Sequence, residues 1–254
     1  MAVSGPSLPP STRFVAMTAL TRLLGVDRCL DVFYGAAADE PRLGCLARLF
    51  RGLKPPRFPT LFEALINAFA CQQVTLSLGI QLLNRLAATS VRGSALPSDR
   101  SYAFPSSDEL ARLEPGDLRA LGFSRQKGEA IIELARTVAT HRFDLDELEE
   151  LDDAAAVARL RSLRGVGRWT AEYVLLRGLG RLHVFPGDDV GARNSLQRWL
   201  GMLEPLDYDG VQRVLAEWQP FQGLVYLHLL LWGLQPEHGK PTASVRRLGN
   251  SVLR

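Results

Sequence analysis

The sequence predicts an all-α fold. From Arg13 onward, apolar residues recur every three to four positions in almost every segment, which is the spacing of one face of an amphipathic helix. Strand-like alternation is scarce, and the best candidate for a strand is the short run RLHVF at 181–185. The connections are short and contain no Gly/Ser linker, so we expect two packed helical lobes and not two tethered domains.

The predicted helices follow one another closely along the chain. Several begin with start signals: Pro59-Thr60 precede a periodic apolar run, Ser106–Glu109 form a capping sequence, and Pro115 suits a first helical turn. Residues 1–12 are rich in Pro and Ser and are expected to form a flexible arm. The helices are expected at 14–24, 28–36, 41–52, 59–71, 74–89, 107–113, 115–121, 125–141, 153–162, 168–179, 189–200, 208–217 and 223–233.

The composition is that of an ordinary globular protein. Of 254 residues, 46% are hydrophobic and 22% are charged, which is sufficient for one sizeable core or two smaller ones. The 30 Lys and Arg exceed the 27 Asp and Glu, giving a net charge of +3. This weak positive charge permits a nucleic-acid partner but does not require one.

The cysteines and apolar runs exclude several classes of protein. Cys29, Cys45 and Cys71 are far apart and no CxxC occurs, so the sequence offers neither a zinc ribbon nor an iron–sulfur cluster. The N-terminus lacks the apolar stretch of a signal peptide, and the longest apolar run, 224–234, is too short to span a bilayer. We therefore expect an intracellular, cytoplasmic protein with no membrane partner and no metal site. His141, His183 and His238, which show no metal spacing and no partnering acid, are predicted to be structural, and Arg246, Arg247 and Arg254 are expected in a solvated tail.

One turn between two predicted helices has the composition of an anion-binding loop. The chain reads Leu-Arg-Gly-Val-Gly over 163–167, directly before the helix 168–179. Two glycines around one apolar residue permit unusual backbone angles and leave the amides uncovered, at a helix N-terminus where anions bind. The alternative is a tight connection between two helices with no ligand. The predicted contacts with a DNA backbone are Arg164, Gly165, Val166, Gly167 and Arg168.

This loop resembles the helix–hairpin–helix loop of the large DNA glycosylase superfamily, whose usual form is Leu-Pro-Gly-Val/Ile-Gly. Arg164 stands in the place of the proline. In that superfamily a Gly/Pro-rich segment and a characteristic aspartate follow about twenty residues later. Here the segment is FPGDD, and Asp189 lies 22 residues after Gly167.

The resemblance is more specific than one loop. The run GRWTAEY at 167–173 is similar to the characteristic run of the alkylation-repair branch, the 3-methyladenine DNA glycosylase II family. The segments 62–83, 104–135 and 217–236 follow the same family pattern. The resemblance therefore extends from about residue 15 to about residue 238.

By this resemblance, Asp189 takes the place of the catalytic aspartate, because it leads the pattern D-V-G-A-R. Asp188 is then left as the cap of the helix 189–200, the role that either aspartate could have on local grounds alone. A carboxylate suits the excision of a purine alkylated at N3 or N7, since the cationic base leaves readily and the sugar becomes oxocarbenium-like. At roughly 4 Å and an effective dielectric of about 20, the attraction is worth about 4 kcal/mol, or about a thousandfold in rate. The same group can orient the attacking water.

The resemblance also assigns the base pocket. Trp169 and Tyr173 are four residues apart and share one helix face. Such a pair is usually part of a core, but beside an extruded base it would stack on the cationic ring. In the branch that also nicks the backbone, a lysine that forms a Schiff base stands where this chain has Trp169. We therefore expect a monofunctional enzyme that leaves an abasic site.

Gln73 takes the place of the residue that wedges into the duplex, although an exposed helix end also explains Gln72-Gln73. Leu229–Leu231 stand where the family places a Trp-Tyr pair, so Leu230 is predicted to line a more open pocket.

The resemblance implies two helical lobes with a DNA-binding cleft between them and the hairpin at the cleft. The expected lobes are 13–61 plus 182–254, which carries Asp189, and 62–181, which ends in the helix–hairpin–helix 153–179. The family's longer members begin with a mixed β domain, and we expect the compact form without an N-terminal β domain. The expected partner is double-stranded DNA containing alkylated bases, bound by a monomer. No cofactor is expected beyond a monovalent cation on the hairpin carbonyls.

Two alternatives remain open. The same scaffold could act on a deaminated, etheno or oxidised base. A non-catalytic hairpin module that only binds the DNA backbone is the other alternative, but it gives no reason for Asp189 or for the Trp169–Tyr173 face.

Overall fold

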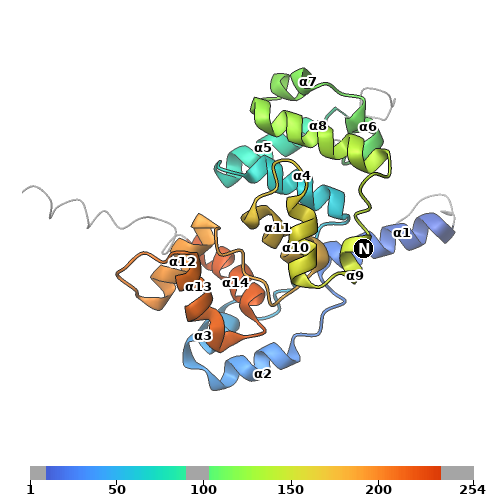
Figure 1. Ribbon diagram of the computed structural model, residues 1–254. Helices are drawn as coiled ribbons and strands as arrows, with labels where there is room; N and C mark the ends of the chain where they lie inside the picture. The colour runs from blue at the N-terminus through green and yellow to red at the C-terminus, as the bar shows by residue number, and fades with distance from the viewer. Residues whose placement is uncertain (1–9, 90–102, 236–254) are drawn as a thin grey trace, which may run out of the picture. The chain divides into compact units, whose positions relative to one another are not determined.

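A computed structural model describes residues 10–89 and 103–235 (Figure 1). Every regular element in these two ranges is a helix, which confirms the predicted all-α fold for them. The run 181–185 is a turn followed by irregular chain, and the Val184 amide donates to the Arg181 carbonyl, so its prediction as a strand candidate was wrong. Five alternating residues do not make a strand unless a partner strand accepts their backbone hydrogen bonds.

The chain forms two compact units, each of which is discontinuous in sequence. The first comprises the described residues of Met1–Cys29 and Lys54–Pro186, and the second those of Leu30–Leu53 and Gly187–Arg254. The helices of the first unit are α1 (Pro10–Leu24), α4 (Leu61–Cys71), α5 (Leu76–Ala87), α6 (Ser107–Ala111), α7 (Pro115–Ala120), α8 (Arg125–Ala139), α9 (Glu147–Glu150), α10 (Asp153–Arg161) and α11 (Arg168–Val174), which continues as a π-helical turn over Leu175–Leu179. Those of the second are α2 (Asp31–Asp39), α3 (Pro41–Leu49), α12 (Val190–Leu200), α13 (Tyr208–Leu215), a 3₁₀ turn (Ala216–Trp218) and α14 (Gln222–Leu234).

The N-terminal part of the chain is grouped differently from the lobes that the sequence predicts. Residues 13–29 and 54–61 lie in the first unit and not with the C-terminal helices. Arg22 of α1 explains this placement, since its guanidinium donates to the carbonyls of Phe58 at 3.1 Å and Gly178 at 2.8 Å. Residues 10–12 of the expected flexible arm form the first turn of α1, and residues 1–9 lie outside the described residues, as do His238 and the three C-terminal arginines.

The first unit is built around α4. This helix packs against α5, α8, α11 and the π-helical turn, and its side chains Leu65, Ile66 and Phe69 are fully buried. Its start follows the predicted signal, because Thr60 accepts a hydrogen bond from the Glu63 amide at 3.1 Å. The capping box predicted at Ser106–Glu109 is also confirmed. These local signals set where α4 and α6 begin.

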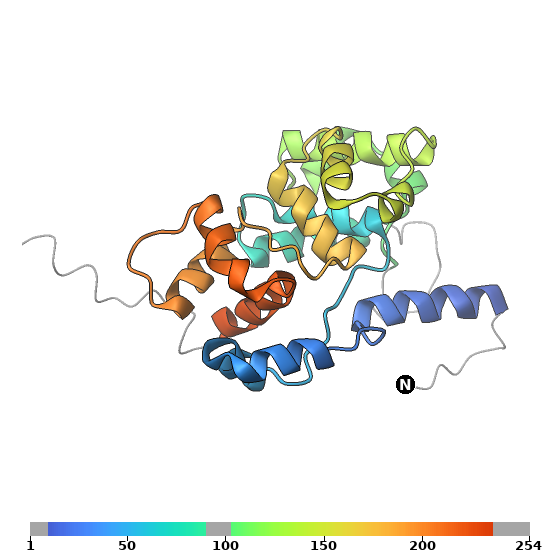
Figure 2. The ribbon, with the colours of Figure 1, turned by 60° about the horizontal axis from the view of Figure 1, so that its bottom comes forward.

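The second unit brings together two parts of the chain that are far apart in sequence. Figure 2 shows α2 and α3 in blue beside the orange and red C-terminal helices of the same unit. α14 packs against both α3 and α12. Its buried residue His228 lies 5.2 Å from Phe33 of α2, measured between ring centroids. Among the described helices, none is long and apolar enough to cross a membrane.

Candidate active site

The two hairpin glycines, between α10 and α11, have different structural requirements. Gly165 has a φ of +81°, and a Cβ there would lie 3.0 Å from the Ala130 Cβ and 3.3 Å from Cε1 of Phe69. Gly167 has an ordinary φ of −91°, and a Cβ there would find no atom within 4 Å beyond its chain neighbours. The fold therefore requires glycine at 165, whereas at 167 glycine leaves open space above the start of α11.

The apolar residue between the glycines points inward. Val166 is 8% exposed and belongs to the core of the first unit, while its amide donates to the Leu163 carbonyl at 3.2 Å. Its side chain packs into the turn between the two helices. A ligand outside the turn would therefore meet backbone at this position and not the side chain.

Of the two arginines beside the hairpin, Arg164 is anchored to α8. It forms ion pairs with Glu129 and, at 3.5 Å, with Glu133, and its side chain remains 52% exposed. A hydrogen bond from Arg125 and the charge of Arg164 hold the pKa of Glu129 below its usual range. Arg168 is exposed and begins α11. Arg164 thus steadies the loop in addition to the phosphate contact predicted for it.

A hydrogen-bonded connection that the sequence analysis missed joins the end of α4 to the hairpin. The Gln72 side-chain amide donates to the Gly165 carbonyl at 3.0 Å and to Oγ1 of Thr170 at 2.7 Å. From α8, Lys127 donates to the carbonyl of Gln72 at 2.6 Å and to that of Ala70 at 3.0 Å. Burial lowers the pKa of Lys127 below its ordinary value. The sequence predicts no role for Gln72 beyond an exposed helix end, because no local pattern identifies such a distant partner.

Gln73, the predicted wedge, lies next to this connection. It is exposed and has a φ of +53°, a left-handed conformation that is uncommon for residues other than glycine. Since Gln72 is hydrogen-bonded to the hairpin, the position of the Gln73 backbone is coupled to the position of the loop.

Trp169 and Tyr173 lie together on one face of α11, as predicted. Their rings stack with centroids 5.2 Å apart and an interplanar angle of 25°. Both side chains are half-buried, and the Tyr173 hydroxyl donates to Oδ1 of Asn67 on α4 at 2.9 Å. The ring of Phe58 lies 6.2 Å from that of Tyr173. The aromatic pair is therefore a partly exposed, fixed surface that begins two residues after Gly167.

The structure corrects the roles of the two aspartates before α12. Asp189, and not Asp188, is the N-cap residue, because its Oδ1 accepts a hydrogen bond from the Ala192 amide at 2.8 Å. A cap accepts from the amide two or three residues further on and has extended backbone angles. Asp189 meets both conditions, with φ −70° and ψ 105°. The capping role predicted for Asp188 therefore belongs to Asp189, the residue that is also the candidate catalytic aspartate.

The other carboxylate oxygen of Asp189 is also hydrogen-bonded. Oδ2 accepts from the hydroxyl of Tyr226, on α14, at 2.9 Å. Leu230, the predicted pocket residue, is half-buried and lies one turn after Tyr226 on the same side of α14. The sequence analysis missed Tyr226, although a tyrosine in the apolar run 224–234 is a signal, since a buried hydroxyl needs a partner.

His183, predicted to have no acid partner, has one. Its Nε2 lies 2.5 Å from Oδ2 of Asp153, whose other oxygen accepts from Arg181 at 2.6 Å. Burial alone would raise the pKa of Asp153, but the hydrogen bonds from His183 and Arg181 outweigh it and lower that pKa. The group ties the chain after the π-helical turn to the start of α10, which is a structural role.

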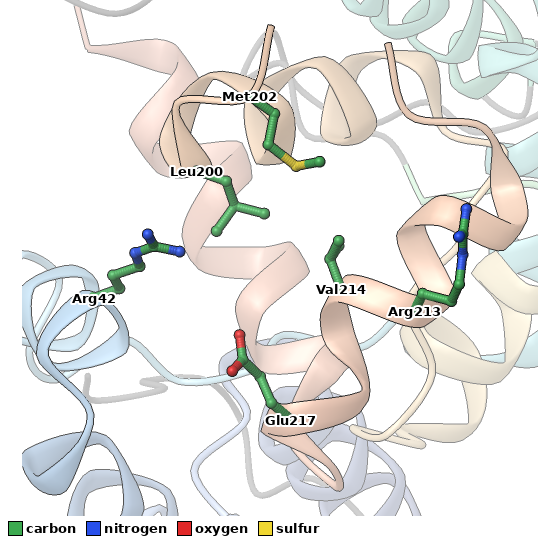
Figure 3. A pocket seen from close by; sticks show the side chains of 6 residues that line it. All are labelled: Arg42, Leu200, Met202, Arg213, Val214 and Glu217. Carbon is green, nitrogen blue, oxygen red and sulfur yellow. The ribbon is translucent and has the colours of Figure 1, made fainter. Parts of the chain in front are cut away.

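A shallow pocket of about 430 Å³ in the second unit contains none of the predicted site residues. Arg42, Arg213 and Glu217 supply its polar groups, and aliphatic side chains supply the remainder (Figure 3). Over residues 10–89 and 103–235, no three His, Cys, Asp or Glu side chains are grouped closely enough to hold a metal ion.

Comparison with known proteins agrees with this geometry. Residues 66–220 match the family model described as HhH-GPD superfamily base excision DNA repair protein. The chain is 31% identical over 207 residues to a DNA-3-methyladenine glycosylase of Bacillus subtilis (strain 168), covering 82% of this chain and 68% of the relative. It is 30% identical over 219 residues to DNA-3-methyladenine glycosylase 2 of Escherichia coli (strain K12), covering 85% and 73%.

A solved structure has a similar fold. The structure of a 3-methyladenine DNA-glycosylase from Archaeoglobus fulgidus superposes with a TM-score of 0.79 at 26% identity, covering 89% of this chain and 77% of that one. The family match spans the hairpin, the aromatic pair and Asp189. This chain therefore belongs to the HhH-GPD superfamily of base excision DNA repair proteins.

Proposed function

We propose that this protein is a monofunctional DNA glycosylase that excises alkylated purines of the 3-methyladenine and 7-methylguanine type from double-stranded DNA. The observation that carries the proposal is the construction of the start of α11. Gly167 leaves space over a helix N-terminus where the fold itself does not need glycine, and the stacked pair of Trp169 and Tyr173 follows within two turns. A backbone phosphate fits the first feature and a flat, cationic base the second. The printed names of the bacterial relatives support the same substrate class.

In the proposed reaction the hairpin amides and Arg168 bind the phosphates of the lesion strand. Gln73 enters the duplex, and the extruded base stacks on Trp169 and Tyr173. The bond between C1′ and the base nitrogen breaks, and the base leaves with the electron pair. The negative charge of Asp189 stabilises the cationic sugar, and water adds to C1′ with loss of a proton. No amine stands at Trp169 to form a Schiff base, so the product is an intact strand with an abasic site.

The decisive experiment incubates the protein with methylated duplex DNA and separates the freed bases by chromatography. We expect release of 3-methyladenine and 7-methylguanine and a loss of about a thousandfold in Asp189→Asn, the magnitude estimated above for the carboxylate. Borohydride should trap no covalent adduct. The absence of both free bases contradicts the proposal, and full activity of Asp189→Asn contradicts the role of Asp189 even if bases are released.

One difference from the family pattern, in the predicted pocket wall, bears on the range of lesions. Leu230, where the family places an aromatic residue, gives a pocket wall of aliphatic character. We propose a more open pocket, which predicts that 7-methylguanine is released faster, relative to 3-methyladenine, than by relatives with an aromatic wall. Replacing Leu230 by Trp should lower that ratio. An unchanged ratio would contradict the proposed wall, whereas release of only deaminated or oxidised bases would support the alternative substrate class.

A monovalent cation on the hairpin carbonyls stays a prediction. The carbonyl of Gly165 accepts from Gln72 and that of Leu163 from Val166, and each oxygen keeps a second lone pair. These carbonyl oxygens therefore fit such an ion as ligands. No step of the reaction is assigned to the ion. We further propose that the enzyme acts as a monomer.

A further inference from the structure

Both carboxylate oxygens of Asp189 are held by groups from different helices. Oδ1 accepts from the Ala192 amide of α12 at 2.8 Å, and Oδ2 accepts from the Tyr226 hydroxyl of α14 at 2.9 Å. Tyr226 is 2% exposed, so its ring has little freedom to move. An N-cap hydrogen bond alone leaves the second oxygen free to swing, whereas two donors restrict rotation of the carboxylate plane.

Close packing of α14 on α12 places Tyr226 at this distance. Gly233 lies two turns after Tyr226 on the same side of α14, and a Cβ at Gly233 would lie 3.0 Å from Oγ of Ser195 on α12. Ser195 is itself buried. The small residue therefore permits the two helices to approach closely. That approach brings the tyrosine hydroxyl to the first residue before α12.

The energetics favour this partner for the hydroxyl. A buried hydroxyl needs a hydrogen-bond partner, and a bond to an ionised oxygen is shorter and stronger than one between neutral groups. In return, the carboxylate is preorganised, since it need not reorient as positive charge develops on the sugar.

We propose that Tyr226 is a positioning residue for the reaction, acting through Asp189. This inference rests on the proposed function. The hydroxyl holds Oδ2 so that the charge of Asp189 meets the cationic sugar in one orientation. Tyr226 contributes to the chemical step, whereas DNA binding depends on the hairpin in the other unit of the chain.

The test compares Tyr226→Phe with wild type under single turnover at saturating enzyme, using duplex DNA with one 7-methylguanine. We expect the excision rate to fall about tenfold, which corresponds to about 1.4 kcal/mol. The Kd for duplex DNA containing an abasic site should remain within about twofold of the wild-type value, which is small compared with the tenfold change in rate. The matched control is Tyr34→Phe in the same unit. It also removes a hydroxyl hydrogen bond, the one accepted from the Gly52 amide at 3.0 Å, and should leave the rate unchanged.

A double variant separates positioning from general stability. In an Asp189→Asn background, Tyr226→Phe should cause no further loss of the residual rate, because its effect passes through Asp189. The inference is overturned if Tyr226→Phe excises at the wild-type rate, if Tyr34→Phe loses as much, or if the loss persists in the double variant. Equal losses of rate and DNA affinity also overturn it. If wild type releases no base, the proposed function fails; if wild type is active and only the Tyr226 results disagree, the positioning role alone fails.

Discussion

Replacing the hairpin glycines by alanine, one at a time, tests whether the loop is shaped by the fold or by a ligand. At Gly165, alanine must adopt φ +81°, and the left-handed conformation costs a residue with a Cβ about 1–2 kcal/mol. The new Cβ also lies 3.0 Å from the Ala130 Cβ, and crowding of this kind in a core costs about 1–3 kcal/mol. We expect the free energy of unfolding to fall by about 2–5 kcal/mol, the range that these two costs span together.

At Gly167 the same change should leave stability nearly unaltered. The φ of −91° suits any residue and no atom other than chain neighbours lies within 4 Å of the new Cβ. Alanine is a poorer N-cap than glycine, but it also lowers the entropy of the unfolded chain, and the latter effect stabilises by about 0.4–1 kcal/mol. The methyl group would occupy the space in which a phosphate approaches the loop amides. We therefore expect affinity for duplex DNA to fall by about tenfold or more, that is by about 1.4 kcal/mol.

The assays are thermal or urea unfolding and fluorescence anisotropy with labelled duplex DNA at one fixed salt concentration, because such affinities depend on salt. Gly116→Ala is the matched control, since its Cβ also meets no atom within 4 Å and the residue belongs to α7 and not to the hairpin. It should leave DNA affinity unchanged, and through the same entropy effect it should raise the free energy of unfolding by about 0.4–1 kcal/mol. Wild-type DNA affinity in Gly167→Ala, or wild-type stability in Gly165→Ala, would refute the reasoning.

Three further predictions concern hydrogen bonds and titration. Gln72→Leu should lower the free energy of unfolding by about 1–3 kcal/mol, because it leaves the Gly165 carbonyl and the Thr170 hydroxyl without the amide that donates to them. Urea unfolding measures this loss, and base release should slow as well. Burial lowers the pKa of His228, so below about pH 6.5 the unfolded chain binds a proton that the folded chain does not. The free energy of unfolding, measured in urea, should therefore fall from pH 7.5 to pH 5.5. An equally steep fall in the His228→Gln variant would contradict this assignment. The pKa of Asp153 is lowered, so this carboxylate contributes to the free energy of unfolding above about pH 4 and loses that contribution on further acidification. In urea unfolding, the Asp153→Asn variant should therefore lose less stability than wild type as the pH falls.

Local patterns in the sequence determined much of the fold and part of the candidate site. Helix starts at Thr60 and Ser106 are encoded by side chains that bond to amides three residues away. The shared face of Trp169 and Tyr173 follows from their spacing within one helix. The short helix α9 was missed because its four residues span only about one turn, too few to show a period.

Only the tertiary structure decided which distant groups meet. The bond from Gln72 to Gly165 joins residues 93 apart, and that from Tyr226 to Asp189 joins residues 37 apart. The placement of α1 in the first unit likewise depends on Arg22 reaching carbonyls far along the chain. A helical period or a cap is written within a few residues, because the interacting groups are neighbours in the chain. A hydrogen bond between helices depends on how closely they pack, as at Gly233, and that is decided by the side chains of both helices together.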